Sequence, residues 1–234
     1  QVSVDTVFHG HGHGSRSFEG FFMELGNDDT RGNAAILSRI LAYTERGGKG
    51  GALLEALGNG SNGLARAFDA RTEDLKAAGA SGNSCLLLKL IKELATEALR
   101  LRVIGNRYDG PQGHFLDYLF MSLSGIRVEK FEAVFLDSDN VLAIETLSEG
   151  SIAHTAVYPR KAVEASLRLG ANQAIFLHNH PSGDAAPSDT DKELIVTLDK
   201  AFAAAGFIVR DHLIIGSRRH WSAAKEGWSM GKRP

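Results

Sequence analysis

Disulfides and long apolar runs are both missing from this sequence. The one cysteine among 234 residues, Cys85, cannot form an internal disulfide, which is typical of proteins in a reducing compartment. It lies in the apolar run Cys85–Leu90, and a small buried core residue is the simplest interpretation. No stretch reaches the roughly 20 apolar residues of a membrane helix, and the N-terminus lacks the basic-then-apolar order of a secretory signal. We therefore expect a cytoplasmic protein without a membrane partner.

An excess of positive charge is also missing. Lys and Arg number 26 against 28 for Asp and Glu, so the formal net charge is -2. Such a chain has no overall positive field to attract a nucleic acid, and any DNA contact must depend on a local patch. With 43% apolar and 23% charged residues, the composition is that of a globular protein with one or two domains.

The first half of the chain has the apolar spacing of helices. Between Phe18 and Arg107 the apolar residues recur every three or four positions, with glycine-rich breaks at Gly47–Gly51 and Gly58–Gly63. The earlier tract His9–His13 alternates with glycine and offers loose metal affinity at best. Because the turn-forming segment Arg107–Gly113 ends this pattern, we predict a small all-helical domain over 1–108 and a second domain over 109–234.

The second half alternates short apolar strands with helices, which predicts an α/β (α+β) domain with a mixed sheet flanked by helices. We expect helices at 116–123, 159–169 and 188–205. The second has proline in its first turn, and the third is ended by glycine. We expect strands at 131–136, 141–144 and 174–177, and one or two more within 207–215.

A candidate metal site follows the strand at 174–177. Side chains two apart on a strand point to the same face about 6 to 7 Å apart, so His178 and His180 can aim at one point. Pro181 stops the strand, and a loop leads to a helix whose first turn presents Asp191. Two imidazoles and one carboxylate suit Zn²⁺ and leave a fourth position open, as in catalytic sites. Zinc deaminases are excluded because they need a later P-C-x-x-C motif.

Several nearby polar residues allow two interpretations each. Ser188 and Asp191 form a Ser-x-x-Asp sequence, which is a helix capping box as well as part of the candidate site. Asp211 and His212 either orient a metal ligand or simply end a strand as a polar pair, and we favour the structural interpretation.

These motifs carry a family resemblance. His178–Asp184 (HNHPSGD), Pro187–Asp191 (PSDTD) and Asp211–Gly216 (DHLIIG), with Val157–Arg160 (VYPR) upstream, resemble the RadC family, bacterial members of the JAMM/MPN metalloprotease fold. The resemblance covers about half of the chain, from Pro111 to Gly216.

The resemblance implies roles for individual residues. His178, His180 and Asp191 would bind zinc, Ser188 would support an oxyanion, and Glu129 would be the general acid/base. Peptide or isopeptide hydrolysis of a protein substrate by a zinc-activated water is the implied reaction. The competitors for the role of Glu129 are Glu132, Glu145 and Glu149.

Two other functions remain open. RadC-like chains carry a DNA-binding helix-hairpin-helix near Leu75–Gly82, but Ala80 and Ser81 replace its expected glycine and apolar residue, so we expect at most a weak DNA contact. A basic face is interleaved with acidic residues and consists of Lys76, Lys89, Lys92, Arg100 and Arg102. A metal-free MPN scaffold is the second alternative, although every ligand position is filled. Gly58–Gly63 and Gly47–Gly51 lack the context of dinucleotide and phosphate loops.

Overall fold

The computed structural model describes residues 30–45, 53, 55, 57, 63–150, 158–217 and 219–228. The His9–His13 tract, the segment Gly47–Gly51, most of Gly58–Gly63 and Val157 lie outside these residues. No helix in the described part of the chain is both long enough and apolar enough to cross a membrane.

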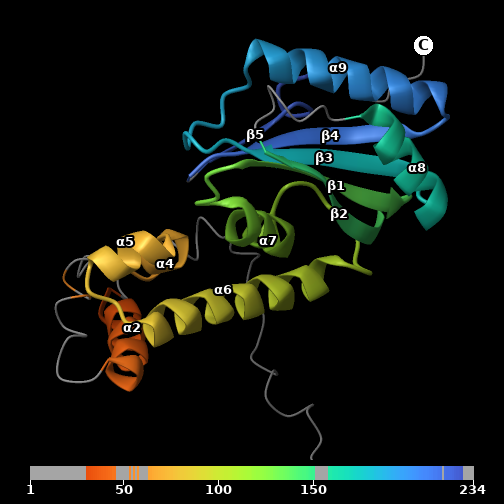
Figure 1. Ribbon diagram of the computed structural model, residues 1–234. Coiled ribbons are helices and arrows are strands. Elements are labelled where there is room, and N and C mark those ends of the chain that lie inside the picture. Colours follow the sequence, from red (N-terminus) through yellow and green to blue (C-terminus); the bar gives the residue numbers. More distant parts are fainter. Residues whose placement is uncertain are drawn as a thin grey trace, which may run out of the picture.

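A mixed sheet forms the centre of the C-terminal half (Figure 1). Its strands are β1 (Glu129–Asp137), β2 (Asn140–Gly150), β3 (Gln173–Asn179), β4 (Ile208–Ile215) and β5 (His220–Ser222), in the order β2-β1-β3-β4-β5. Strands β3 and β4 are parallel, and every other neighbouring pair is antiparallel. This arrangement confirms the predicted α/β class with a mixed sheet.

Helices cover both faces of the sheet. Helix α7 (Gly113–Leu123) packs on one face, and α8 (Pro159–Leu169) and α9 (Asp189–Ala204) lie on the other (Figure 1). The central strands β1 and β3 are therefore buried on both faces, which explains why their sequences are nearly continuous apolar runs. Alternate residues of β3 contribute to separate cores, with Ile175 and Leu177 facing α7 and Ala174, Phe176 and His178 facing α9.

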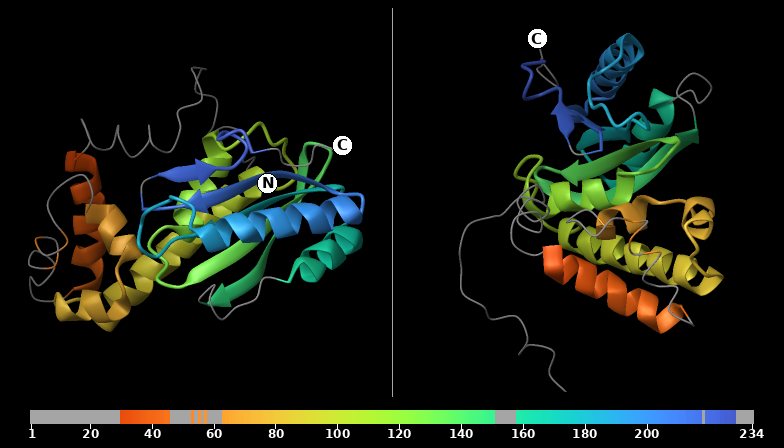
Figure 2. Two further views of the ribbon diagram at one scale, coloured as in Figure 1. Left: turned by 90° about the horizontal axis from the view of Figure 1, so that it is seen from above. Right: turned by 90° about the vertical axis from the view of Figure 1, so that its left-hand side faces the viewer.

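The N-terminal helices have a core of their own. Helices α2 (Thr30–Thr44), α4 (Gly63–Asp69), α5 (Thr72–Ala77) and α6 (Gly82–Val103) surround a cluster of buried apolar side chains. That cluster contains Leu37, Leu41, Leu53, Leu57, Ala67, Leu75, Ala80, Cys85 and Leu88. Helix α6 continues from this cluster to α7 below the sheet, whereas α2, α4 and α5 lie to one side (Figures 1 and 2).

Candidate metal centre

Three predicted ligands converge at the end of β3. His178 is the penultimate residue of β3, His180 follows the strand, and Asp191 lies in the first turn of α9. Their ligand atoms all lie within 4.8 Å of one another. His178 is 0% and Asp191 1% exposed. The group is therefore a buried, preformed cluster of two imidazoles and a carboxylate.

The donor geometry fits one metal ion. Nε2 of His178 lies 3.1 Å from Nε2 of His180 and 3.2 Å from Oδ1 of Asp191, and Nε2 of His180 lies 3.3 Å from Oδ2 of Asp191. Ligands about 2.0 to 2.1 Å from a tetrahedral zinc ion are separated by roughly 3.3 Å, which is close to the distance between the two histidine nitrogens and to the distance from each histidine to its nearer carboxylate oxygen. Two neutral imidazoles that both turn a lone pair inward repel each other unless a cation lies between them. Oδ1 of Asp191 is also buried without a hydrogen bond.

Helix α9 holds the carboxylate in place through its own cap. Oδ2 of Asp191 accepts the backbone N–H of Ser188 at 2.8 Å and its hydroxyl at 2.5 Å, while the backbone N–H of Asp191 donates to Oγ of Ser188. The capping box is thus present, and the same contacts orient a proposed ligand. Burial opposes ionisation, but the neighbouring imidazoles of His178 and His180 and the hydrogen bonds from Ser188 together keep the pKa of Asp191 below its usual value.

The loop after β3 fixes the orientation of His180. Its ring Nδ1–H donates to the carbonyl oxygen of Asp184 at 2.8 Å, and its backbone N–H donates to Ile215 at 2.9 Å. A carbonyl can only accept, so Nδ1 carries a proton, and a neutral His180 would offer the lone pair of Nε2 to a metal ion. The loop packs closely on the end of β4, because a Cβ on Gly216 would lie 2.4 Å from the carbonyl oxygen of Gly183. Glycine at that position therefore allows the contact that holds the loop.

Strand register places one of the four candidate glutamates beside the cluster. Phe131 of β1 pairs with His178 at the end of the ladder and belongs to the core on the α9 side, and Glu129, two residues earlier in the same strand, lies on the same face of β1. The pKa of His180 is raised, first by the carboxylate of Asp191 and to a smaller extent by that of Glu129. Glu129 thus lies close enough to influence His180.

The competing glutamates have other partners or face the other way. Glu132 projects from the opposite face of β1, is 3% exposed and forms an ion pair with Lys130 at 2.5 Å. Glu145 pairs with Arg168 at 2.6 Å. Glu149 lies opposite Lys130 in the ladder and shares its face. This placement favours Glu129 among the four.

Asn179 ties β3 to the segment that carries Glu129, a contact that the sequence interpretation missed. Its amide donates to the carbonyl oxygens of Ile126 and Val128 at 3.1 and 3.0 Å, and its Oδ1 accepts the N–H of Lys130 at 2.8 Å. The residue is 2% exposed. An Asn between two ligand histidines, facing away from them, was the only sequence signal.

The polar pair Asp211 and His212 separates onto the two faces of β4. Asp211 accepts hydrogen bonds from the hydroxyl of Ser222 and from the backbone N–H of His212 and Ala224, so it holds the end of β5. His212 lies on the α9 face, with its Nε2 3.0 Å from Nδ1 of His178. Burial, followed by the charge of His178, lowers the pKa of His212 well below its usual value. The structural interpretation therefore describes Asp211, whereas His212 contacts a proposed ligand.

Comparison with known families agrees with this geometry. The model of the RadC-like JAB domain matches residues 112–228, which is half of the chain. The chain belongs to the RadC family. The matched residues contain α7 and the sheet, and therefore the His178, His180 and Asp191 cluster.

Curated relatives of this RadC-family chain are bacterial UPF0758 proteins. One from Rhodobacter capsulatus is 36% identical over 141 residues, which are 60% of this chain and 66% of the relative. One from Ruegeria pomeroyi is 35% identical over 142 residues, which are 60% of this chain and 63% of the relative. The matches thus span slightly less than two thirds of these relatives, and their names state no activity.

The connection from α5 to α6 forms the hairpin at which the RadC resemblance predicted a degraded DNA-binding motif. Ser81 caps α6, and Oε1 of Glu45 accepts the backbone N–H of Ser81 at 2.6 Å and the hydroxyl of Ser84 at 2.5 Å. Two residues of the predicted basic face are engaged in ion pairs, Lys92 with Asp69 and Arg100 with Glu97. A carboxylate of the chain itself therefore occupies the N-terminal end of α6.

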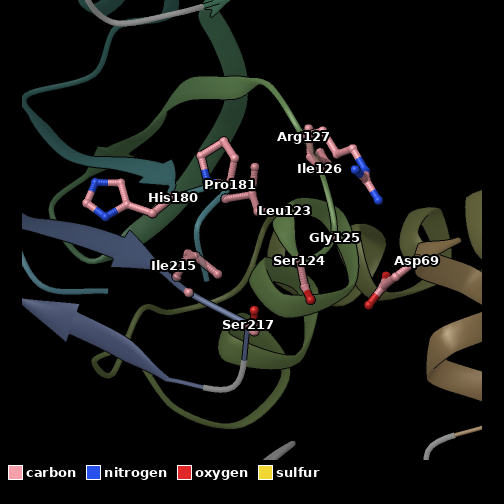
Figure 3. Close-up of a pocket in the computed structure, with 11 residues that line it drawn as sticks. Asp69, Leu123, Ser124, Gly125, Ile126, Arg127, His180, Pro181, Ile215 and Ser217 are labelled. Atoms are coloured by element: carbon pink, nitrogen blue, oxygen red, sulfur yellow. The ribbon is translucent and has the colours of Figure 1, made fainter. Parts of the chain in front are cut away.

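A cleft of about 320 Å³ lies between the end of α4 and the RadC-like domain (Figure 3). Asp69 comes from α4, Ser124 and Arg127 follow α7, and Pro181 and Ser217 come from loops at the end of the sheet. Figure 3 shows the ring of His180 directed away from Ser124 and Asp69. The cleft thus lies behind the ligand loop rather than in front of the donor atoms.

Proposed function

We propose that this chain is a zinc-dependent metallohydrolase that cleaves a peptide or isopeptide bond. The observation that carries the proposal is the convergence of His178, His180 and Asp191, whose two Nε2 atoms lie 3.1 Å apart and 3.2 and 3.3 Å from separate oxygens of the carboxylate. Membership of the RadC family, with its JAB-type domain, supports the same reaction class. A zinc ion bound there would supply Lewis acidity, polarising a carbonyl and making water a nucleophile at neutral pH.

The residues of the chain supply the remaining chemistry. The Glu129 carboxylate, on the same face of β1 as Phe131, would take a proton from the attacking water and deliver it to the leaving amine. The Ser188 hydroxyl would rotate from Asp191 to the developing oxyanion. The backbone N–H of Ser188, 2.8 Å from Oδ2, would keep Asp191 oriented during that rotation. The histidines need no proton transfer, since their role is to hold the ion.

Metal content tests the proposal directly. We expect zinc to co-purify at about one ion per chain, and His178→Ala or Asp191→Ala to remove it, because either change takes away one of three protein ligands. Elemental analysis of the purified variants measures the ratio. Matched controls are His114→Ala and Asp189→Ala, whose side chains are 57% and 93% exposed and are not among the proposed ligands. Unchanged zinc in either ligand variant would defeat the proposal.

The substrate is proposed only as a class, a peptide or protein. A cleavage screen over peptides and conjugates, run with and without a chelator, is the measurement that narrows the substrate class.

We also propose a cytoplasmic setting, because Cys85 is a free thiol buried in the helical core. The alternative proposal is DNA contact through the helical domain. It is disfavoured because the Glu45 carboxylate already accepts the backbone N–H of Ser81 at the hairpin and would repel a phosphate there.

A further inference from the structure

We propose that His212 is a positioning residue that sets the tautomer of His178 and thereby the zinc affinity of the site. This inference rests on the proposed function. The observation is a hydrogen-bonded pair of imidazoles, with Nδ1 of His178 3.0 Å from Nε2 of His212. Both rings are 0% exposed, so water cannot replace either partner.

Metal binding requires a defined proton arrangement in this pair. Nε2 of His178 faces His180 and Asp191, so a neutral His178 that offers this atom to a metal carries its proton on Nδ1. That N–H points at Nε2 of His212, which must then accept. His212 consequently carries its own proton on Nδ1. The opposite tautomer of His212 would donate to His178 and direct the His178 proton toward the metal position.

The surroundings of His212 make this arrangement of protons energetically unfavourable. Its Nδ1 is buried and has no hydrogen-bond partner in the described part of the chain. The ring packs against Phe131 and Phe176, with centroids 5.7 and 6.5 Å away. A buried N–H without an acceptor is unfavourable, so the structure keeps a strained polar group where an apolar residue would pack without penalty. A role at the metal explains why a histidine lies there.

A neutral imidazole also differs from the usual partner of a ligand histidine. Most metal-bound histidines donate their second N–H to a carboxylate or a carbonyl oxygen, and an anionic partner makes the ligand more basic. His212 accepts the hydrogen bond without adding negative charge. The metal at this site would therefore remain a stronger Lewis acid than one backed by a His–carboxylate pair.

Two substitutions separate an acceptor role from a packing role. His212→Gln keeps a side-chain oxygen that can accept from His178, whereas His212→Phe fills the space without an acceptor. Phe176→Leu serves as the control, since it disturbs the same buried cluster and leaves both histidines in place. Zinc affinity is measured by competition with a chelator, and the melting temperature is measured on zinc-free protein.

We expect His212→Phe to lower zinc affinity by about 10- to 100-fold, the size of effect typical of outer hydrogen-bond partners. If the Phe variant loses zinc affinity by roughly 100-fold, the zinc affinity of His212→Gln should be at least about tenfold higher than that of the Phe variant. The melting temperature of zinc-free His212→Phe should be no lower than that of the zinc-free parent. Phe176→Leu should melt lower but change zinc affinity less than about threefold. In the zinc-loaded parent, ¹⁵N NMR should show protons on Nδ1 of both His178 and His212.

Several results would overturn the inference. The first is an unchanged zinc affinity in His212→Phe, and the second is an equal loss of zinc affinity in the Gln and Phe variants. The third is a loss of zinc affinity in Phe176→Leu as large as that in His212→Phe. The fourth is a proton on Nε2 of His212 in the zinc-loaded protein. Each of these leaves the proposed function intact if the parent binds zinc. A parent that binds no zinc overturns both proposals together.

Discussion

At the scale of single residues, the three consecutive side chains His178, Asn179 and His180 connect three parts of the site. The two histidines face the metal position, while Asn179 faces the opposite side and binds the segment 126–130. Glu129 lies within that segment, directly before the N–H that Asn179 accepts. The strand thus positions the proposed metal ligands and the proposed proton carrier through one short sequence.

The position of Glu129 can be tested by a double-mutant cycle. We expect Glu129→Gln to retain zinc and to lower kcat by at least about 100-fold, because the amide cannot carry the proton. Asn179→Ala should retain zinc and lower kcat by about tenfold, since the segment loses three hydrogen bonds. If Asn179 acts through Glu129, Asn179→Ala should have no further effect once Glu129→Gln is already present. The assay is steady-state hydrolysis of a substrate from the screen.

If the losses in kcat are additive in that cycle, Asn179 does not act through Glu129. Full activity in Glu129→Gln would transfer the role to another glutamate, and Glu132→Gln is the matched control on the same strand. Glu132 is buried on the other face, so its substitution should affect stability rather than kcat.

At the scale of elements, the apolar period of the sequence was sufficient to find the helices after residue 113 and every strand of the sheet except β5, which lies beyond the expected 207–215. The helices expected at 159–169 and 188–205 are confirmed as α8 and α9, and the strand expected at 174–177 is confirmed as β3. Strand β2 is longer than the predicted 141–144, since it reaches Gly150. Its later residues are mostly half-exposed at the edge of the sheet, and their polar side chains hid the strand.

The contact between His178 and His212 could not have been predicted, because it depends on a one-residue irregularity. Ala174 pairs with Val209, but the next residue, Ile175, pairs with Asp211. A shift of one residue moves every later side chain to the other face of the sheet. Without it, His212 would pair with Leu177 and face α7. The ligand spacing of His178 and His180, by contrast, is local and was visible in the sequence.

The hairpin at the start of α6 gives a prediction at the same scale. Glu45 occupies the backbone donor that a phosphate would otherwise bind, so we expect the unmodified chain to bind DNA weakly. Glu45→Ala should tighten binding severalfold at low salt, an effect that falls as salt rises. Fluorescence anisotropy with a labelled duplex measures both. Glu73→Ala removes the same charge from the first turn of α5 and is the control.

Equal behaviour of the Glu45 and Glu73 variants would show that net charge, rather than the helix end, decides the affinity. No DNA binding by either variant would remove the hairpin from consideration as a phosphate site. Loss of the Glu45 contact should also cost about 1 kcal/mol of stability, as for a helix cap.

At the scale of the whole molecule, α6 belongs to both parts of the chain. Its N-terminal half contributes Cys85 and Leu88 to the helical core. Its C-terminal end contributes Val103, with Leu99 packed beside it, to the core between α7 and the sheet. The sequence placed a boundary in the turn-forming segment Arg107–Gly113, because composition marks where a helix ends and does not show what that helix packs against.

The two ways of dividing the chain predict different stabilities for the C-terminal half. A fragment 109–234 lacks Leu99, Val103, Ile104 and Tyr108, all of which pack on the α7 core, whereas a fragment 95–234 keeps them. Burial of an apolar side chain contributes roughly 1.5 to 3 kcal/mol, so the shorter fragment should lose at least about 3 kcal/mol. A loss of that size corresponds to a melting temperature about 10 °C lower, measurable by circular dichroism. Equal melting temperatures would place the boundary after α6, as the sequence predicts. A lower melting temperature for the shorter fragment would assign the end of α6 to the domain that carries the candidate metal centre.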